Sequence, residues 1–158
     1  MTERIAFGRP LEASEDQFIH LVPRPSTALL GRFAIAAIFL VSGSAKLLDV
    51  QGTAAHMSAV GIPYAQTLAM FAGVAEILGA LSLVFGALTR VGAIGLILFM
   101  IPTTLLFHNF WVYEGDEQRT QLVNFLKNLG LTGGLILLIS YGPGRYSIDS
   151  LLRRPLEP

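Results

Sequence analysis

The sequence predicts an all-α integral membrane protein, an up-down-up-down bundle of four spanning helices with both termini in the cytoplasm. Hydrophobic residues make up 53% of the 158-residue chain and charged residues 14%, and mean hydropathy is +0.59, so polar surface is too scarce for a soluble domain. Four apolar segments can each cross a hydrocarbon core of about 30 Å, which takes about 20 helical residues. Short connections between them are typical of antiparallel bundles. The predicted regions are a polar N-terminal arm at 1–26, the bundle at 27–141 and a C-terminal tail at 142–158.

Turn-forming residues precede the first two predicted spans. The first span, 27–48, follows Pro25, and Ser26 or Thr27 can cap its first turn. A loop containing two glycines and a proline then leads to the second span, 64–86. Both segments therefore have recognisable starts as well as sufficient length.

The last two predicted spans are separated by a polar loop. A tight turn at 87–89 joins the second span to the third, 90–110. The strongly polar loop at 114–118 leads to the fourth span, 122–141. The sequence Gly142-Pro143-Gly144 should end that helix, because glycine accepts a left-handed conformation and proline cannot continue a helix.

Positive charges near the span ends predict the orientation of the bundle. Seven arginines lie in the arm, the 87–90 turn and the tail, whereas Arg119 is alone in the loops of the other side. By the positive-inside rule the arm and the tail are cytoplasmic, and the loops around His56 and Glu117 face the outside. The seven are Arg4, Arg9, Arg24, Arg90, Arg145, Arg153 and Arg154.

Composition and motifs argue against several classes of function. Equal numbers of basic and acidic groups, 11 each, give no electrostatic reason to bind nucleic acid. Without cysteine the chain offers no disulfide, thiolate nucleophile or thiol redox chemistry. Haem is disfavoured because His108 is the only histidine in a predicted span, and His56 with His108 lacks a third metal ligand. We therefore expect no catalytic residue, no metal site and no cofactor belonging to the chain itself.

Glu76 occupies the middle of the second predicted span, a costly position for a carboxylate. A charge at the centre of a spanning helix costs about 3 kcal/mol on insertion scales. Small residues at helical spacing around Glu76 predict a face that packs against other helices. Lys46 can meet Glu76, because the two side chains lean toward each other on antiparallel helices. Three interpretations stay open: a buried ion pair or protonated acid that fixes packing, a role in proton or quinol chemistry, and binding of an unknown ligand.

Other polar residues fall in the same outer half of the predicted bundle. Lys127 either reaches Glu76 across a depth difference of about 10 Å or snorkels to the headgroups. Arg32, near the cytoplasmic end of the first span, is expected to snorkel. The candidate polar cluster comprises Lys46, Glu76, His108, Asn109, Lys127 and Asn128.

Aromatic residues flank His108. Trp111 fits the aromatic belt at a membrane surface, where a histidine needs no ligand. Alternatively, His108 hydrogen-bonds a quinone carbonyl while Phe107, Phe110 and Trp111 pack against the ring. Pro102 should kink the third span and open space near His108.

Short motifs recur in order along residues 27–150. They are Gly31-Arg32, Ser42-Gly43 with Lys46, Glu76 with Gly79, Thr89-Arg90, Phe107-His108 with Phe110-Trp111, Phe125-Leu126-Lys127-Asn128-Leu129 with Gly133-Gly134, and GPGRYSID at 142–149. This ordered set resembles the DoxX family of small four-helix membrane proteins. Members of that family are associated with quinol-linked respiratory enzymes, including thiosulfate:quinone oxidoreductases and terminal oxidases, and with membrane assemblies that handle oxidative stress.

The resemblance implies an accessory subunit of a larger, redox-linked quinone or respiratory complex in a bacterial inner (plasma) membrane. Its expected partners are the lipid bilayer and other membrane protein subunits, and no nucleic acid. The alternative is a membrane protein that binds a quinone or a lipid at its own outer-side polar site. A small transporter is a third hypothesis, disfavoured because the polar residues thin out toward the cytoplasm.

Overall fold

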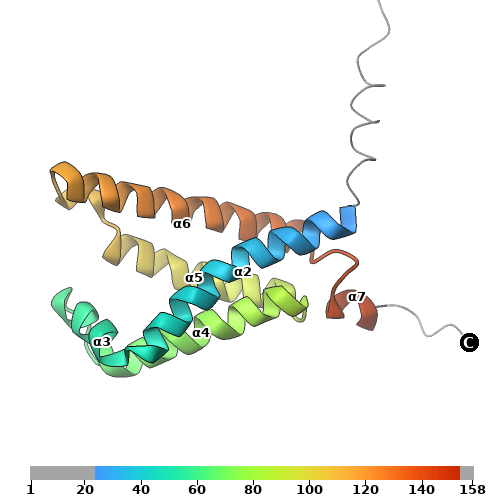
Figure 1. Cartoon of the computed structure of the whole chain (residues 1–158), viewed down its shortest axis with the longest axis horizontal. Coiled ribbons are helices and arrows are strands. Elements are labelled where there is room, and N and C mark those ends of the chain that lie inside the picture. Colours follow the sequence, from blue (N-terminus) through green and yellow to red (C-terminus); the bar gives the residue numbers. More distant parts are fainter. Residues whose placement is uncertain (1–23, 154–158) are drawn as a thin grey trace, which may run out of the picture.

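The computed structural model describes residues 24–153, which form a bundle of four long antiparallel helices (Figure 1). Each is long and apolar enough to cross a membrane, so the predicted up-down-up-down membrane bundle is confirmed. The predicted N-terminal arm lies outside the described residues up to residue 23, and 24–26 already belong to the first helix. The long helices are α2 (Arg24–Leu48), α4 (Ala65–Phe85), α5 (Thr89–Phe107) and α6 (Gly115–Tyr141).

Two segments predicted as loops are partly helical. Helix α3 (Val50–Ala59) occupies the predicted loop after the first span, and the Asp49 carboxylate caps it by accepting a backbone N–H at 2.8 Å. Helix α6 begins at Gly115 and not at 122, with Asp116 and Glu117 in its first turn. Carboxylates there interact favourably with the positive end of the helix dipole. The acidic run that suggested a loop is therefore the start of a helix.

The third predicted span is interrupted shortly before its expected end. Helix α5 stops before His108, and a single 3-10 turn, η1 (Phe110–Val112), follows. The rings of Phe110 and Trp111 lie 5.4 and 6.3 Å from the ring of Phe125 on α6, measured between centroids. These edge-on contacts fasten the end of the third span to α6.

Glycines allow α2 and α4 to approach closely. A Cβ placed on Gly43 would lie 2.9 Å from the Gly73 carbonyl oxygen, and a Cβ on Gly73 would lie 3.1 Å from that of Gly43. The small residues at helical spacing around Glu76 are buried, as their pattern predicted. The α2–α4 contact therefore holds Glu76 inside the protein and away from lipid.

The apolar core lies among the four spans. A second, smaller cluster, centred on Met57 of α3 and Ala69 of α4, packs α3 against the bundle. The main core is formed by buried residues of α2, α4, α5 and α6. Its buried members are Ala36, Phe39, Ala80, Leu83, Ala93, Leu96, Met100 and Leu135.

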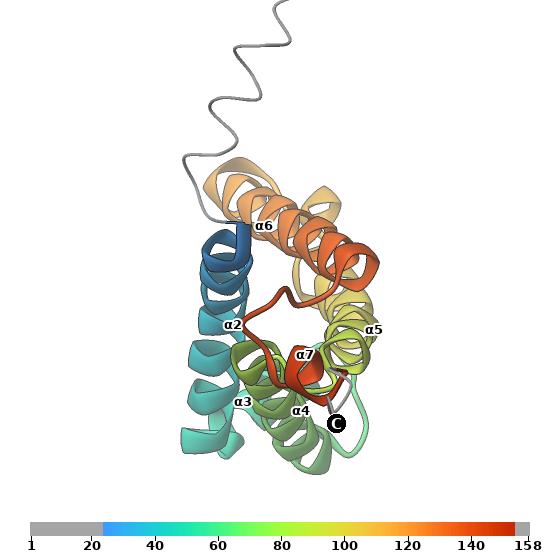
Figure 2. The ribbon, with the colours of Figure 1, turned by 90° about the vertical axis from the view of Figure 1, so that its right-hand side faces the viewer.

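The chain after α6 folds back over one end of the bundle. Helix α7 (Ile148–Leu152) lies across that end beside α4 and α5, and the start of α2 lies at the same end (Figures 1 and 2). Helix α6 stops at Gly142, which has a φ of +81°, as the glycine-proline-glycine sequence predicted. Residues 142–153 of the predicted tail thus pack over this end of the bundle.

Arg32 holds this returning segment and does not snorkel, so that prediction is wrong. Its side chain is 1% exposed, and it donates hydrogen bonds to the carbonyl oxygens of Pro143 at 2.9 Å and Tyr146 at 2.6 Å. Charge-assisted bonds of this kind offset the cost of burying a guanidinium. The acceptors lie more than 110 residues away in sequence, which is why local patterns did not indicate them.

Asp149 joins α7 to the start of α5. Its carboxylate accepts hydrogen bonds from the backbone N–H of Leu88 at 2.8 Å and of Thr89 at 2.9 Å, and from the Thr89 hydroxyl at 2.8 Å. Burial alone raises the pKa of Asp149, but the hydrogen bonds from Thr89 and Leu88 and the charge of Arg153 outweigh burial and hold this pKa below its ordinary value. A side chain distant in sequence therefore caps α5.

Candidate functional site

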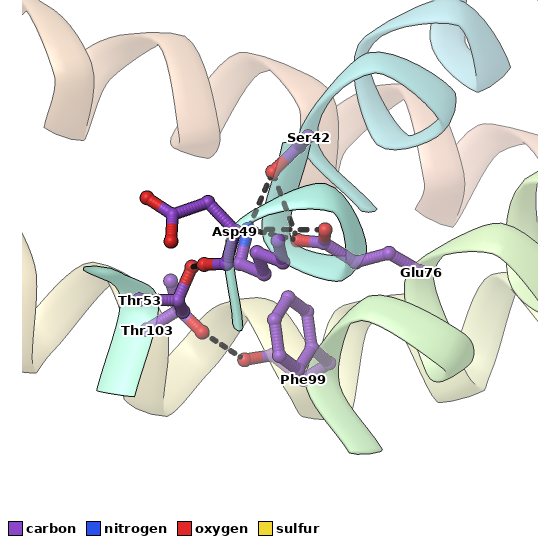
Figure 3. A network of polar contacts seen from close by, with 7 residues as sticks. Ser42, Asp49, Thr53, Glu76, Phe99 and Thr103 are labelled. Atoms are coloured by element: carbon purple, nitrogen blue, oxygen red, sulfur yellow. Dashed lines mark hydrogen bonds and ion pairs between the residues drawn. The ribbon is translucent and has the colours of Figure 1, made fainter. Parts of the chain in front are cut away.

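The most buried charged group toward the end of the bundle that carries α3 is Glu76, which is 3% exposed. Lys46 Nζ lies 3.2 Å from Glu76 Oε1 and 3.1 Å from Oε2, so the predicted meeting of these two residues is observed. The Ser42 hydroxyl donates to Glu76 Oε1 at 3.2 Å and accepts from Lys46 Nζ at 2.6 Å. Figure 3 shows Ser42 and Glu76 pointing toward one another from α2 and α4.

Residue spacing on α2 and its close approach to α4 explain why Ser42, Lys46 and Glu76 form this triad. Ser42 and Lys46 are four residues apart on α2, so both side chains lie on one helical face. Gly43 lies between them and lets that face approach α4. Both carboxylate oxygens of Glu76 have donors, which is the condition under which a buried charge is tolerated.

The triad borders a cavity of about 170 Å³ between all four spans. The cavity brings together five of the six residues predicted for the polar cluster, with Asn109 the exception. Ser42 and Thr103 are additional polar lining residues that sequence analysis did not select. The apolar part of the lining is Ile38, Phe39, Met100 and Leu131.

Two hydrogen-bonded side chains from α6, Gln121 and Glu117, orient His108 at the cavity. Its Nδ1 lies 2.9 Å from Gln121 Oε1, and Gln121 Nε2 donates to Glu117 Oε1 at 2.7 Å. Since the Gln121 nitrogen donates to Glu117, its oxygen faces His108 as the acceptor, and Nδ1 of His108 carries a hydrogen. Within residues 24–153, His108 Nε2 has no hydrogen-bond partner. This nitrogen is free to contact a ligand.

The other predicted polar residues have separate partners. Lys127 lines the cavity, but its Nζ donates to Asn124 Oδ1 at 3.1 Å and does not pair with Glu76. Asn128 is 8% exposed, and its Nδ2 donates to Thr104 Oγ1 at 2.9 Å. Asn109 lies outside the cavity lining, and its buried Oδ1 has no partner in the described part of the chain.

The three predicted aromatic residues do not line this cavity. Phe107 stacks on His56 of α3, with ring centroids 5.2 Å apart. Phe110 and Trp111 instead pack against Phe125. Their contact with a ligand stays a prediction: helix α5 ends before His108, and the flanking rings pack on α3 and α6.

An apolar groove between α5 and α6 adjoins the polar cavity. The groove has a volume of about 190 Å³ and shares Met100 and Asn128 with the cavity. Its rim residues Ile101, Leu105 and Leu129 are each at least half exposed, on the surface that meets lipid. The remaining lining residues are Thr104, Phe125 and Thr132. Polar and apolar spaces therefore adjoin each other at Asn128.

The fold and the site define a small integral membrane protein, a four-helix bundle with a cavity between its spans that charged and polar residues line. The chain belongs to the DoxX family, whose family model matches residues 27–109. The resemblance noted from the motifs is thereby confirmed. No solved structure matches the chain.

Several named membrane proteins are similar to the chain. It is 33% identical over 126 residues to the inner membrane protein YphA of Escherichia coli (strain K12), covering 80% of this chain and 90% of YphA. Identity to the inner membrane protein YqjF of the same organism is 35% over 127 residues, covering 80% and 92%. The uncharacterized membrane protein Rv3486 of Mycobacterium tuberculosis is 30% identical over 145 residues, covering 82% and 83%. Together with the four spans, these relatives place the chain in the bacterial inner membrane, as predicted.

Proposed function

We propose that the chain binds the head group of a quinone in the polar cavity and serves a redox-linked complex of the inner membrane. The observation that carries this proposal is the junction at Asn128, where a cavity lined by charged and polar groups meets an apolar groove that faces lipid. A quinone needs both environments, because its ring carbonyls accept hydrogen bonds and its tail is apolar.

The donor set of the cavity fits a carbonyl-bearing ring. Lys127 offers an ammonium, and Asn128 offers an amide at the junction with the groove. His108 Nε2 can accept a hydrogen bond from a hydroxyl of the reduced form, or donate one when the ring is protonated. The rim of the groove would meet the tail at the lipid surface.

The triad of Ser42, Lys46 and Glu76 would bind and release protons at this site. A quinone, when bound, would carry electrons and protons. The Glu76 carboxylate can take up a proton at Oε1 or Oε2, and Lys46 stabilises the ionised state when that proton leaves. Ser42 keeps Oε1 aligned in both states, since a hydroxyl donates or accepts.

The predicted orientation places this cavity on the outer side of the membrane. Lys46, one of its lining residues, is in the last turn of α2. Helix α3, which follows, lies opposite the end where α2 begins and α7 lies (Figure 1). With the termini cytoplasmic, protons would exchange with the outer side. A reporter enzyme active only outside the cell should be inactive when fused after residue 158, and activity of that fusion would reverse the assignment.

Purification from native membranes tests the proposal. Protein extracted in mild detergent should retain a quinone, identified and quantified by mass spectrometry after solvent extraction. The His108→Ala variant should lose at least half of the bound quinone. The control variant Arg119→Gln, which changes an exposed residue outside the cavity, should retain the quinone. A stoichiometric membrane complex without quinone in any variant would replace this proposal with the accessory-subunit function.

A further inference from the structure

A second pocket lies at the other end of the bundle, where the C-terminal segment folds over the helices (Figure 2). Its volume is about 310 Å³, and its walls come from the start of α5, the end of α6 and α7. Two arginines, Arg90 and Arg153, line it beside the 142–144 turn. The walls include Thr89 and Tyr141, the first and last residues of two spans, so the pocket lies at the membrane surface.

Both arginines are available to bind an anion. Within residues 24–153 the salt bridge present is that between Lys46 and Glu76, so neither Arg90 nor Arg153 has an ion-pair partner. Both residues are exposed. The Arg90 guanidinium lies against Gly142, where a Cβ would be 3.9 Å from Nη2. The glycine thus leaves the pocket open beside the charge.

The acidic lining residue does not cancel this positive charge. Asp149 also borders the pocket, but its two oxygens accept three hydrogen bonds from Leu88 and Thr89. Its charge therefore stabilises the start of α5, and the pocket keeps two arginines against this one carboxylate. Arg153 acts on Asp149 electrostatically without contacting it within salt-bridge distance.

We propose that this pocket binds the phosphate of an anionic phospholipid head group through Arg90 and Arg153. Basic pockets at membrane surfaces recognise such head groups. Apolar side chains beside the arginines would meet the acyl chains, because Leu88 is 72% and Val91 65% exposed. Tyr141, 86% exposed at the same rim, has the amphipathic ring typical of the head-group region.

Lipid binding to the full chain tests this site. Protein in a neutral detergent would be titrated with phosphatidylglycerol or cardiolipin, and bound lipid counted by native mass spectrometry against phosphatidylethanolamine. The wild type should prefer the anionic lipids. The double variant Arg90→Gln/Arg153→Gln should bind them about tenfold more weakly. Arg145→Gln, which removes an exposed arginine at the same end outside this pocket, should bind as the wild type does.

The variants should fold, which keeps the outcome interpretable. Arg90 lies in the first turn of α5, where a cation opposes the helix dipole, so its replacement by glutamine removes an unfavourable interaction. If the double variant fails to fold, either single variant gives the same test with a smaller loss. Equal binding by the wild type and the pocket variants, or an equal loss in Arg145→Gln, would overturn the proposal. So would protection against thermal unfolding by inorganic phosphate equal to that by lipid, which would indicate a site for a soluble anion.

Discussion

Lys46 on α2 and Glu76 on α4 form a salt bridge, with Nζ 3.1 Å from Oε2, and small residues around Glu76 are buried on the same helix. The two residues lie 30 positions apart, on the two helices that approach most closely through glycine. The pair is unequally buried, because the Lys46 side chain is 20% exposed and that of Glu76 is 4% exposed. Lys46 is therefore the more exposed partner, although both residues line the cavity.

Glu76→Gln should destabilise the protein, because it leaves the Lys46 ammonium largely buried without its counter-ion. We expect a loss of about 2 kcal/mol, below the value for fully buried pairs since Lys46 is partly exposed. Thermal unfolding in detergent would measure the loss. The double variant Lys46→Met/Glu76→Gln should recover part of it, and strictly additive losses in the cycle would mean that the pair is not coupled.

Gly43→Ala should separate α2 from α4. The new Cβ would lie 2.9 Å from the Gly73 carbonyl oxygen and from Ile77 Cγ1, so we expect a loss of about 2 kcal/mol. Gly31→Ala on the same helix is the matched control. Nothing lies within 4 Å of the Cβ added there, and alanine should leave stability unchanged or raise it by up to about 1 kcal/mol. Equal melting temperatures for the two variants would contradict the close approach.

Asp149 should make stability depend on pH in the acid range. Its pKa in the folded protein lies below the ordinary carboxyl value of about 4, so its stabilisation is present above pH 4 and is lost as pH falls through the folded value. Asp149→Asn should lower stability at neutral pH by about 1 kcal/mol, as loss of a cap does. Melting temperatures from pH 7 to pH 2.5 should converge for the wild type and the variant. A constant difference across that range would show that the ionised carboxylate does not stabilise the fold.

Arg32→Gln should loosen the C-terminal segment. It removes the charge-assisted hydrogen bonds to the carbonyl oxygens of Pro143 and Tyr146, each of which contributes about 1.5 kcal/mol or more. The segment should open more often, and trypsin should cleave after the exposed Arg145 at least about tenfold faster. Mass spectrometry of the fragments would measure the rate of cleavage after Arg145. The control variant Arg119→Gln, changed at the far end of the bundle, should be cleaved after Arg145 at the wild-type rate. An unchanged cleavage rate in Arg32→Gln would show that Arg32 does not hold the segment.

Sequence patterns predicted the spans and the salt bridge because both depend on local spacing. An apolar run of about 20 residues determines a spanning helix, and the small residues around Glu76 determine which face packs. The antiparallel direction of neighbouring spans then brings Lys46 and Glu76 together. These inferences need little knowledge of how distant parts of the chain pack.

Features that depend on distant packing were missed or wrong. Arg32 was expected at the lipid surface, because nothing near it in sequence indicates that carbonyl groups of the 142–146 turn cover it. The capping role of Asp149 depends on the same folding-back. The rings beside His108 were expected around a ligand; they pack on Phe125 and His56, and their contact with a ligand stays a prediction. Phe125, which lines the groove, was not among the candidate site residues.

Fluorescence of Trp111, the single tryptophan of the chain, tests quinone binding most directly. Its ring lies 6.3 Å from that of Phe125, which lines the groove adjoining the cavity, so a bound quinone should quench it. Titration with a short-tailed quinone should give saturable quenching in the wild type and in Arg90→Gln, which is changed at the other end of the bundle. His108→Ala should need at least tenfold more quinone. Quenching that rises linearly without saturation, or that is equal in His108→Ala, would contradict a quinone site in this cavity.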